Sequence, residues 1–167
     1  MIEIKTHNET SLLQVVVLGI PNDFGGVPDL NLCYDPKSKQ NVINGTFPCQ
    51  KDITSEMNEF TNVLTRYGVK VLRPQNIKGL NQIFARDICF VIGNKFIIPN
   101  IIQERKKELE AISGILNNIN SSSIISMPED TRAEGGDVIL FNEYLFIGYS
   151  ENDDFNKYNE LYGKYFK

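Results

Sequence analysis

The fold is decided around one stretch, which reads RAEGGDVILF at residues 132–141. Two carboxylates, Glu134 and Asp137, flank a pair of glycines, and an apolar run follows at once. Because glycine accepts backbone angles that other residues resist, the turn can be tight, with both acids at its rim. Two fixed carboxylates suit a cationic ligand, above all a planar guanidinium, which can pair with a carboxylate through two parallel hydrogen bonds.

A second acidic turn lies upstream of the first. The residues FARD at 84–87 are followed by the apolar residues ICFVI at 88–92. Asp87 and Asp137 lie 50 positions apart. A similar pattern at that interval predicts an internal repeat.

Composition places the chain among ordinary globular proteins. Its 167 residues are 41% hydrophobic and 23% charged, so we expect one domain over residues 1–167. A net charge of −4, with no run of Lys or Arg, argues against a nucleic-acid partner.

No apolar stretch is long enough for a bilayer span, and the N-terminus does not resemble a signal peptide. Three cysteines without a CxxC pair favour a reduced, cytoplasmic setting.

Hydrophobic periodicity predicts an α/β chain with a repeated order of elements. We expect a long irregular loop at 22–51, which is rich in Asn, Asp, Pro and Gly, and a solvent-facing cluster of charges from Glu104 to Glu110. Repeated α/β units are expected at about 10–85, 86–133 and 134–167, and a radial arrangement would bring their acids to one axis. The expected elements are strands at 12–18, 69–72 and 122–127, hairpins at 88–98 and 138–149, and helices at 52–67, 102–119 and from about 153.

Both acidic turns resemble motifs of a known superfamily. The segments FARDICFVIGNKFI at 84–97 and EGGDV at 134–138 are similar to those of amidinotransferases, arginine deiminases and dimethylarginine hydrolases, the pentein superfamily. The likeness is greatest to glycine and inosamine amidinotransferases, and LTRYGVKVLRP at 64–74 supports it. The resemblance implies a five-fold α/β propeller of ββαβ units, about three of which this chain would contain. It also implies action on arginine or a related guanidino compound, in which a cysteine thiolate attacks and a histidine shuttles protons.

The resemblance assigns roles to five residues. Glu134 matches the acid that pairs with the catalytic histidine and the substrate, and Asp87 matches a carboxylate that holds the substrate guanidinium. Asp137 matches a supporting or substrate-binding acid, while Arg86 and Arg132 are substrate-binding candidates that could orient carboxylates. The expected partner is a small guanidino substrate, without a cofactor, nucleic acid or membrane.

The chain departs from the superfamily in its catalytic residues. His7 is its only histidine and no cysteine follows Cys89, whereas superfamily members carry both catalytic residues in their C-terminal half. A missing C-terminal half, or another chain in a homo-oligomer, would have to supply them. The alternative is a catalytically inactive, truncated relative that serves as a ligand-binding or interaction module. Transferase and hydrolase activity both remain open.

Each candidate residue also has a plainer interpretation. Asp87, Glu134 and Asp137 could cap backbone N–H groups of their own turns, or could together bind Mg²⁺ or Ca²⁺. A Zn²⁺ site is disfavoured because the chain has one histidine. Cys89 would share a strand face with Asp87 and could act as a substitute nucleophile, but a buried, hydrophobic role is favoured.

Overall fold

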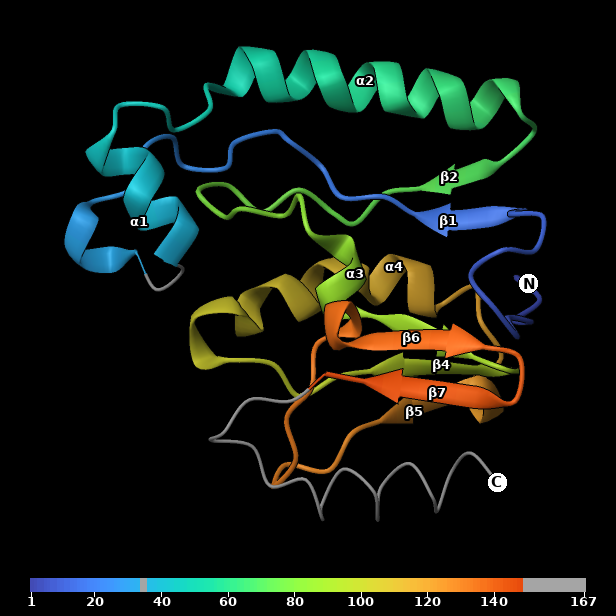
Figure 1. Ribbon diagram of the computed structural model, residues 1–167. Helices are drawn as coiled ribbons and strands as arrows, with labels where there is room; N and C mark the ends of the chain where they lie inside the picture. The colour runs from blue at the N-terminus through green and yellow to red at the C-terminus, as the bar shows by residue number, and fades with distance from the viewer. Residues whose placement is uncertain (34–35, 149–167) are drawn as a thin grey trace. The chain divides into compact units, whose positions relative to one another are not determined.

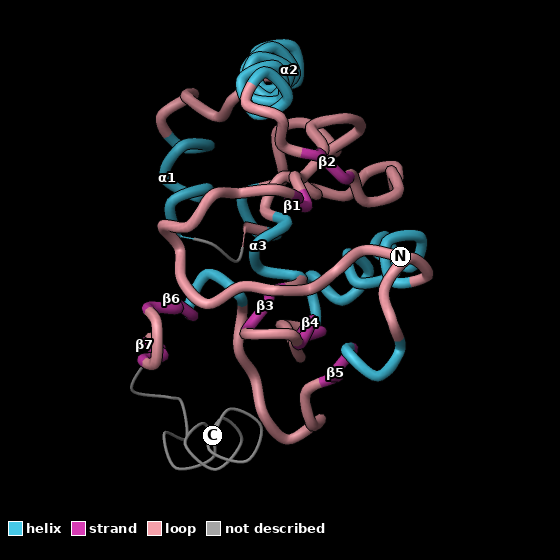
Figure 2. The backbone as a smooth tube through the Cα atoms, turned by 90° about the vertical axis from the view of Figure 1, so that its right-hand side faces the viewer, coloured by secondary structure: helices cyan, strands magenta, loops and turns pink. Residues whose placement is uncertain are grey.

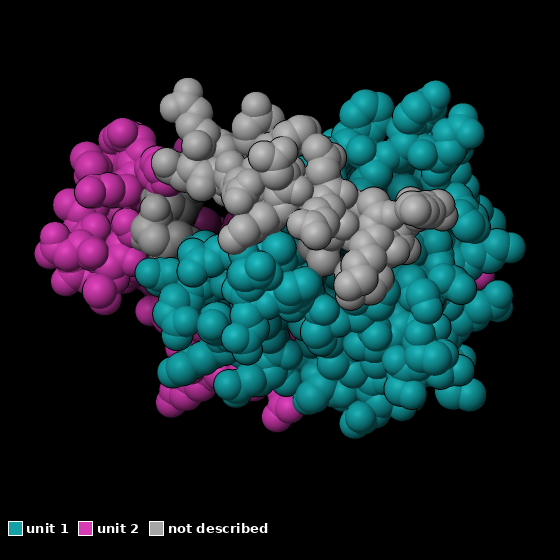
Figure 3. Space-filling model, turned by 90° about the horizontal axis from the view of Figure 1, so that it is seen from below, with its two compact units in different colours: residues 1–13, 85–167 teal, residues 14–84 magenta. Residues whose placement is uncertain are grey.

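The computed structural model describes residues 1–33 and 36–148, and the chain divides into two compact units (Figure 3). Unit 2 is the continuous stretch Gln14–Phe84, and unit 1 joins Met1–Leu13 to the chain from Ala85 onward. Both units contain helices and strands, which confirms the mixed α/β class. Among the described helices, none combines the length and apolar character that a bilayer span requires.

Unit 2 contains two parallel strands joined through a long helix (Figure 1). Strand β1 (Val15–Val17) pairs in parallel with β2 (Lys70–Leu72), a pairing that needs a crossover connection. Helix α2 (Gln50–Arg66) lies within that connection, where a 3.6-residue apolar period predicted it. Gly68 follows the helix with φ of +79°, as expected of a glycine that ends a helix.

The segment 22–51 is not irregular throughout, so this prediction was partly wrong. It contains a short 3₁₀ helix, η1 (Leu30–Leu32), and the helix α1 (Pro36–Ile43). Proline suits the first turn of a helix because its missing N–H would have no partner there. Helix α1 buries none of its residues, so no apolar period marked it in the sequence.

Unit 1 contains a three-stranded sheet in the order β3-β4-β5 (Figure 2). Strands β3 (Phe90–Ile92) and β4 (Lys95–Ile98) form the predicted antiparallel hairpin, which turns at Gly93 with φ of +56°. Strand β5 (Ile124–Ser126) lies parallel to β4. This part of the chain is therefore one ββαβ arrangement. Its helical segments are η2 (Gln103–Ile112), α4 (Ser113–Leu116) and η3 (Ser121–Ser123).

A second hairpin and two short helical turns complete the described part of unit 1. Helix α3 (Ala85–Ile88) precedes β3, and η4 (Gly135–Asp137) leads into the hairpin of β6 (Val138–Phe141) and β7 (Tyr144–Ile147). The helix expected from about residue 153 lies outside the described residues. One cluster of the buried core in this unit consists of Phe90, Ile92, Ile97, Met127, Ala133, Val138 and Leu140.

The segment η2 differs from its prediction in winding and in burial. It is a 3₁₀ helix, which aligns residues three apart. Arg105, Glu108 and Ala111 are buried and have that spacing, and the adjacent Ile112 is buried as well. The expectation that the charges from Glu104 to Glu110 face solvent was therefore wrong for Arg105 and Glu108. Both side chains lie on the same face of the segment as its buried apolar residues, and this face is turned toward the protein interior.

Candidate functional site

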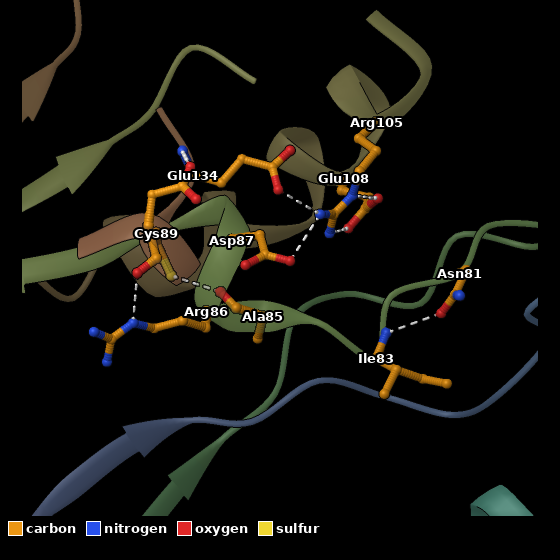
Figure 4. A network of polar contacts seen from close by, with 11 residues as sticks. Asn81, Ile83, Ala85, Arg86, Asp87, Cys89, Arg105, Glu108 and Glu134 are labelled. Carbon is orange, nitrogen blue, oxygen red and sulfur yellow. Dashed lines mark hydrogen bonds and ion pairs between the residues drawn. The ribbon is translucent and has the colours of Figure 1, made fainter. Parts of the chain in front are cut away.

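Four charged side chains from three segments meet in unit 1 (Figure 4). Asp87 comes from α3, Arg105 and Glu108 come from η2, and Glu134 directly precedes η4. Nη1 of Arg105 lies 2.8 Å from Oδ2 of Asp87 and 3.4 Å from Oε2 of Glu134. Asp87, Glu134 and Asp137 were predicted to converge on one site. Asp87 and Glu134, here called the carboxylate pair, do contact one guanidinium nitrogen, whereas Asp137 does not.

The glycines of the EGGD turn allow the two acidic turns to pack closely together. Neither has a positive φ, so the expected role of unusual backbone angles was wrong for this pair. A Cβ atom on Gly135 would overlap the carbonyl oxygen of Arg86. A Cβ on Gly136 would lie 2.7 Å from Oδ1 of Asp87. Glycine is required at 135 for close approach, because any side chain there would push the backbone of α3 away, and a side chain at 136 would displace the carboxylate of Asp87.

Asp137 and Arg132 lie outside the contact between Arg105 and the carboxylate pair. Oδ2 of Asp137 accepts a hydrogen bond from the backbone N–H of Glu134 at 3.2 Å, which matches the turn-capping interpretation. Arg132 is exposed and forms no hydrogen bond or ion pair with another described residue. Their substrate-binding roles stay predictions.

Arg86 holds the EGGD turn and the N-terminal segment in place. Its Nε donates to the carbonyl of Gly135 at 2.8 Å, and its Nη2 donates to the carbonyl of Val138. The same guanidinium pairs with both carboxylate oxygens of Glu9, at 2.9 and 3.2 Å. These contacts give Arg86 a structural role, and its expected part in substrate binding stays a prediction.

We expect Arg86→Ala to lower the free energy of unfolding by about 2 kcal/mol, because two backbone carbonyls lose their donor. Glu9→Gln should cost less than about 1 kcal/mol, because the ion pair is exposed to solvent. Urea unfolding followed by circular dichroism measures both values. Equal losses in the two variants would show that the ion pair, and not the carbonyl bonds, provides the stability.

Burial and neighbouring charges shift the pKa values of Arg105 and Glu134 in this cluster. Burial opposes the charge on Arg105, but its hydrogen bonds to Glu108 and Asp87 outweigh burial, so its pKa lies above the ordinary value. Burial raises the pKa of Glu134, and Arg105 opposes this rise. The carboxylates of Asp87, Asp137 and Glu108 add to the rise, so the pKa of Glu134 stays above its usual range.

Cys89 fits the structural interpretation better than the nucleophilic one. Its thiol is buried, its Sγ lies 3.6 Å from the carbonyl oxygen of Ala85, and burial raises its pKa to about 12. Such a thiol is protonated near neutral pH, whereas the attacking species is the thiolate. The expected strand alternation with Asp87 was wrong, because Asp87 belongs to a helix.

Sequence reasoning missed Arg105 and Glu108. The available signal was their position at helical spacing between apolar residues: Ile101, Arg105, Glu108, Ile112 and Ile115 recur at steps of four and three and are all buried. A charged pair on an apolar stripe needs an internal partner, because an isolated buried charge is costly.

The Mg²⁺ or Ca²⁺ alternative has no geometric support among residues 1–33 and 36–148. No group of three or more His, Cys, Asp or Glu side chains in these ranges is arranged to hold a metal ion. Arg105 contacts the carboxylate pair instead, and Asp137 caps its own turn.

Solved structures of known enzymes share this fold. SxtG, an amidinotransferase from Microseira wollei in the saxitoxin biosynthetic pathway, superposes with a TM-score of 0.73 over 98% of this chain and 61% of its own, at 16% identity. The fold is that of the pentein superfamily. A second protein with the pentein fold is a dimethylarginine dimethylaminohydrolase from Pseudomonas aeruginosa, solved with citrulline. Its TM-score is 0.67 over 92% of this chain and 58% of its own, at 14% identity.

One curated protein is similar in sequence. It is the uncharacterized protein YkgA of Bacillus subtilis (strain 168), which is 29% identical over 149 residues, or 83% of this chain. No protein-family model matches the chain. The chain spans about half of YkgA, at 51%, and less than two thirds of the two solved proteins with the pentein fold.

Proposed function

We propose that this chain supplies guanidinium-binding carboxylates to a guanidino-group-modifying enzyme that acts on arginine or a related compound. One observation carries the proposal: Asp87 and Glu134 already contact a guanidinium, that of Arg105, at 2.8 and 3.4 Å. The pair therefore has the charge and the spacing that a guanidinium requires. The shared fold with an amidinotransferase and a dimethylarginine dimethylaminohydrolase supports the same chemistry.

In this proposal a cysteine thiolate attacks the guanidino carbon and forms a covalent intermediate, while a histidine transfers protons. Glu134 would pair with that histidine and with the substrate, and Asp87 would hold the guanidinium. The buried Cys89 is unsuited to the attack. Because the superfamily that the chain resembles carries its cysteine and histidine in the C-terminal half, both would lie outside these 167 residues. The ββαβ arrangement that ends with β5 would be one unit of a five-fold propeller.

Calorimetric titration of the chain with arginine, agmatine and ornithine tests the proposal. We expect arginine and agmatine to bind and ornithine, which has no guanidinium, to bind more weakly. Asp87→Asn and Glu134→Gln should each weaken arginine binding by about tenfold or more, because each removes one charge-assisted contact.

Glu143→Gln is the matched control, because Glu143 is an exposed acid of the β6–β7 turn and should leave binding unchanged. No heat of binding at millimolar arginine would contradict the proposal. Binding that persists in both carboxylate variants would place the ligand elsewhere. Binding in a full-length protein that turns over no guanidino substrate would favour the ligand-binding module.

A further inference from the structure

The proposed function does not account for the strongest contacts in the cluster. Nε and Nη2 of Arg105 lie 2.7 and 2.8 Å from the two carboxylate oxygens of Glu108. Both side chains are almost fully buried, with exposures of 7% for Arg105 and 3% for Glu108. Figure 4 shows this pair beside Asp87 and Glu134. The pair therefore lies inside the protein and directly next to the carboxylates that would bind a ligand.

Glu108 fixes the orientation of the Arg105 guanidinium. A side-on pair of two parallel hydrogen bonds sets the plane of the group as well as its distance. Moving Arg105 out of the cluster would leave the carboxylate of Glu108 buried without its cation, which is strongly unfavourable. Arg105 is thus held in place, and of the three nitrogens Nη1 is the one with contacts to Asp87 and Glu134.

Nη1 of Arg105 bridges the carboxylate pair through one oxygen of each carboxylate. Nη1 carries two hydrogens, and it donates to Oδ2 of Asp87 and to Oε2 of Glu134. Oδ1 of Asp87 and Oε1 of Glu134 take no part in these bonds. Among these four side chains, three carboxylates face one guanidinium, so the cluster stays negatively charged and still attracts a further cation.

We propose that Arg105 and Glu108 act as a positioning pair for the candidate site. Arg105 holds Asp87 and Glu134 together through Nη1. Glu108 binds Nε and Nη2 of Arg105, so these two nitrogens cannot pair with Asp87 or Glu134. Oδ1 of Asp87 and Oε1 of Glu134, which do not contact Nη1, then remain as acceptors for the guanidinium of a ligand. This inference takes its ligand from the proposed function. The effect of Arg105 on the pKa of Glu134, however, does not depend on any ligand.

Carboxyl-carbon NMR of the ligand-free chain tests the hold of Arg105 on Glu134. In Arg105→Gln the pKa of Glu134 should rise further, because burial and the charges of Asp87, Asp137 and Glu108 then act unopposed. Arg105→Lys keeps the charge and should stay close to the unmodified chain. Lys107→Gln, an exposed neighbour on the same segment, is the control and should leave the titration unchanged.

Arginine binding tests the part played by Glu108. In Glu108→Gln, Arg105 is free to pair with the carboxylates through two nitrogens and should compete with the ligand, so the affinity for arginine should fall about tenfold. Arg105→Lys should bind arginine better than Glu108→Gln, since lysine cannot pair through two nitrogens. Affinity in Glu108→Gln equal to that of the unmodified chain would overturn the role of Glu108.

The two readouts separate failure of this inference from failure of the proposed function. If no guanidine compound binds the unmodified chain, the proposed function fails, while the NMR titration still decides whether Arg105 acts on Glu134. An unchanged pKa of Glu134 in a folded Arg105→Gln variant would overturn the positioning role. Circular dichroism reports folding. If the Gln variant does not fold, nitrogen NMR of the Arg105 guanidinium in the unmodified chain replaces it, and free rotation of that group would overturn the positioning role.

Discussion

Alanine at Gly135 is expected to lower the free energy of unfolding by about 4 kcal/mol or more, which is enough to unfold a marginally stable domain. The added Cβ would overlap the carbonyl oxygen of Arg86 and lie 3.2 Å from Cβ of Phe90. The obstructing oxygen belongs to the backbone of α3, so it cannot swing aside as a flexible side chain could. Urea unfolding followed by circular dichroism measures the loss.

Gly114→Ala is the matched control for this substitution. Gly114 lies in α4, and a Cβ there would meet no other atom within 4 Å. Alanine should therefore stabilise the helix by roughly 0.5–1 kcal/mol. A Gly135→Ala variant as stable as the unmodified chain would show that the two acidic turns do not pack as closely as described.

Replacing Arg105 alone by methionine is expected to cost about 3–5 kcal/mol of unfolding free energy, because a buried charge loses its partner. Glu108, with 3% of its side chain exposed, would then keep its charge without the side-on pair. Glu108→Met should cost less than this, because Arg105 would still contact Asp87 and Glu134.

The double variant Arg105→Met/Glu108→Met isolates the interaction between the two residues. It should cost clearly less than the sum of the single variants, because two apolar side chains can pack where the ion pair was. Chemical unfolding of all four proteins completes the cycle. Strictly additive losses would show that the two side chains do not interact energetically.

The meeting of Asp87 and Glu134 could be predicted from the sequence. Similar acidic turns 50 residues apart, each before an apolar hairpin, indicated that the acids would converge, and both contact Nη1 of Arg105. Helix α2 and both hairpins followed from periodicity and turn residues in the same way. These features rest on an internal repeat and on local patterns, both of which one sequence displays directly.

Features that depend on tertiary contacts were not predictable in this way. Arg105 and Glu108 belong to a charged run that looks solvent-exposed until Asp87 and Glu134 are placed beside it. The need for glycine at 135 arises from the backbone of α3, which is distant in sequence. Helix α1 buries no residue, so its sequence carries no apolar period.

The division of unit 1 between the two ends of unit 2 has a consequence for folding during synthesis. Residues 1–13 leave the ribosome before unit 2, yet their partners come much later: Thr6 pairs with Gly93, Asn8 with Phe141 and Glu9 with Arg86. The intervening stretch 14–84 is continuous and can fold as soon as it is made. Asn8 therefore has no partner until β6 emerges, and closing so large a loop adds an entropic cost to a late step.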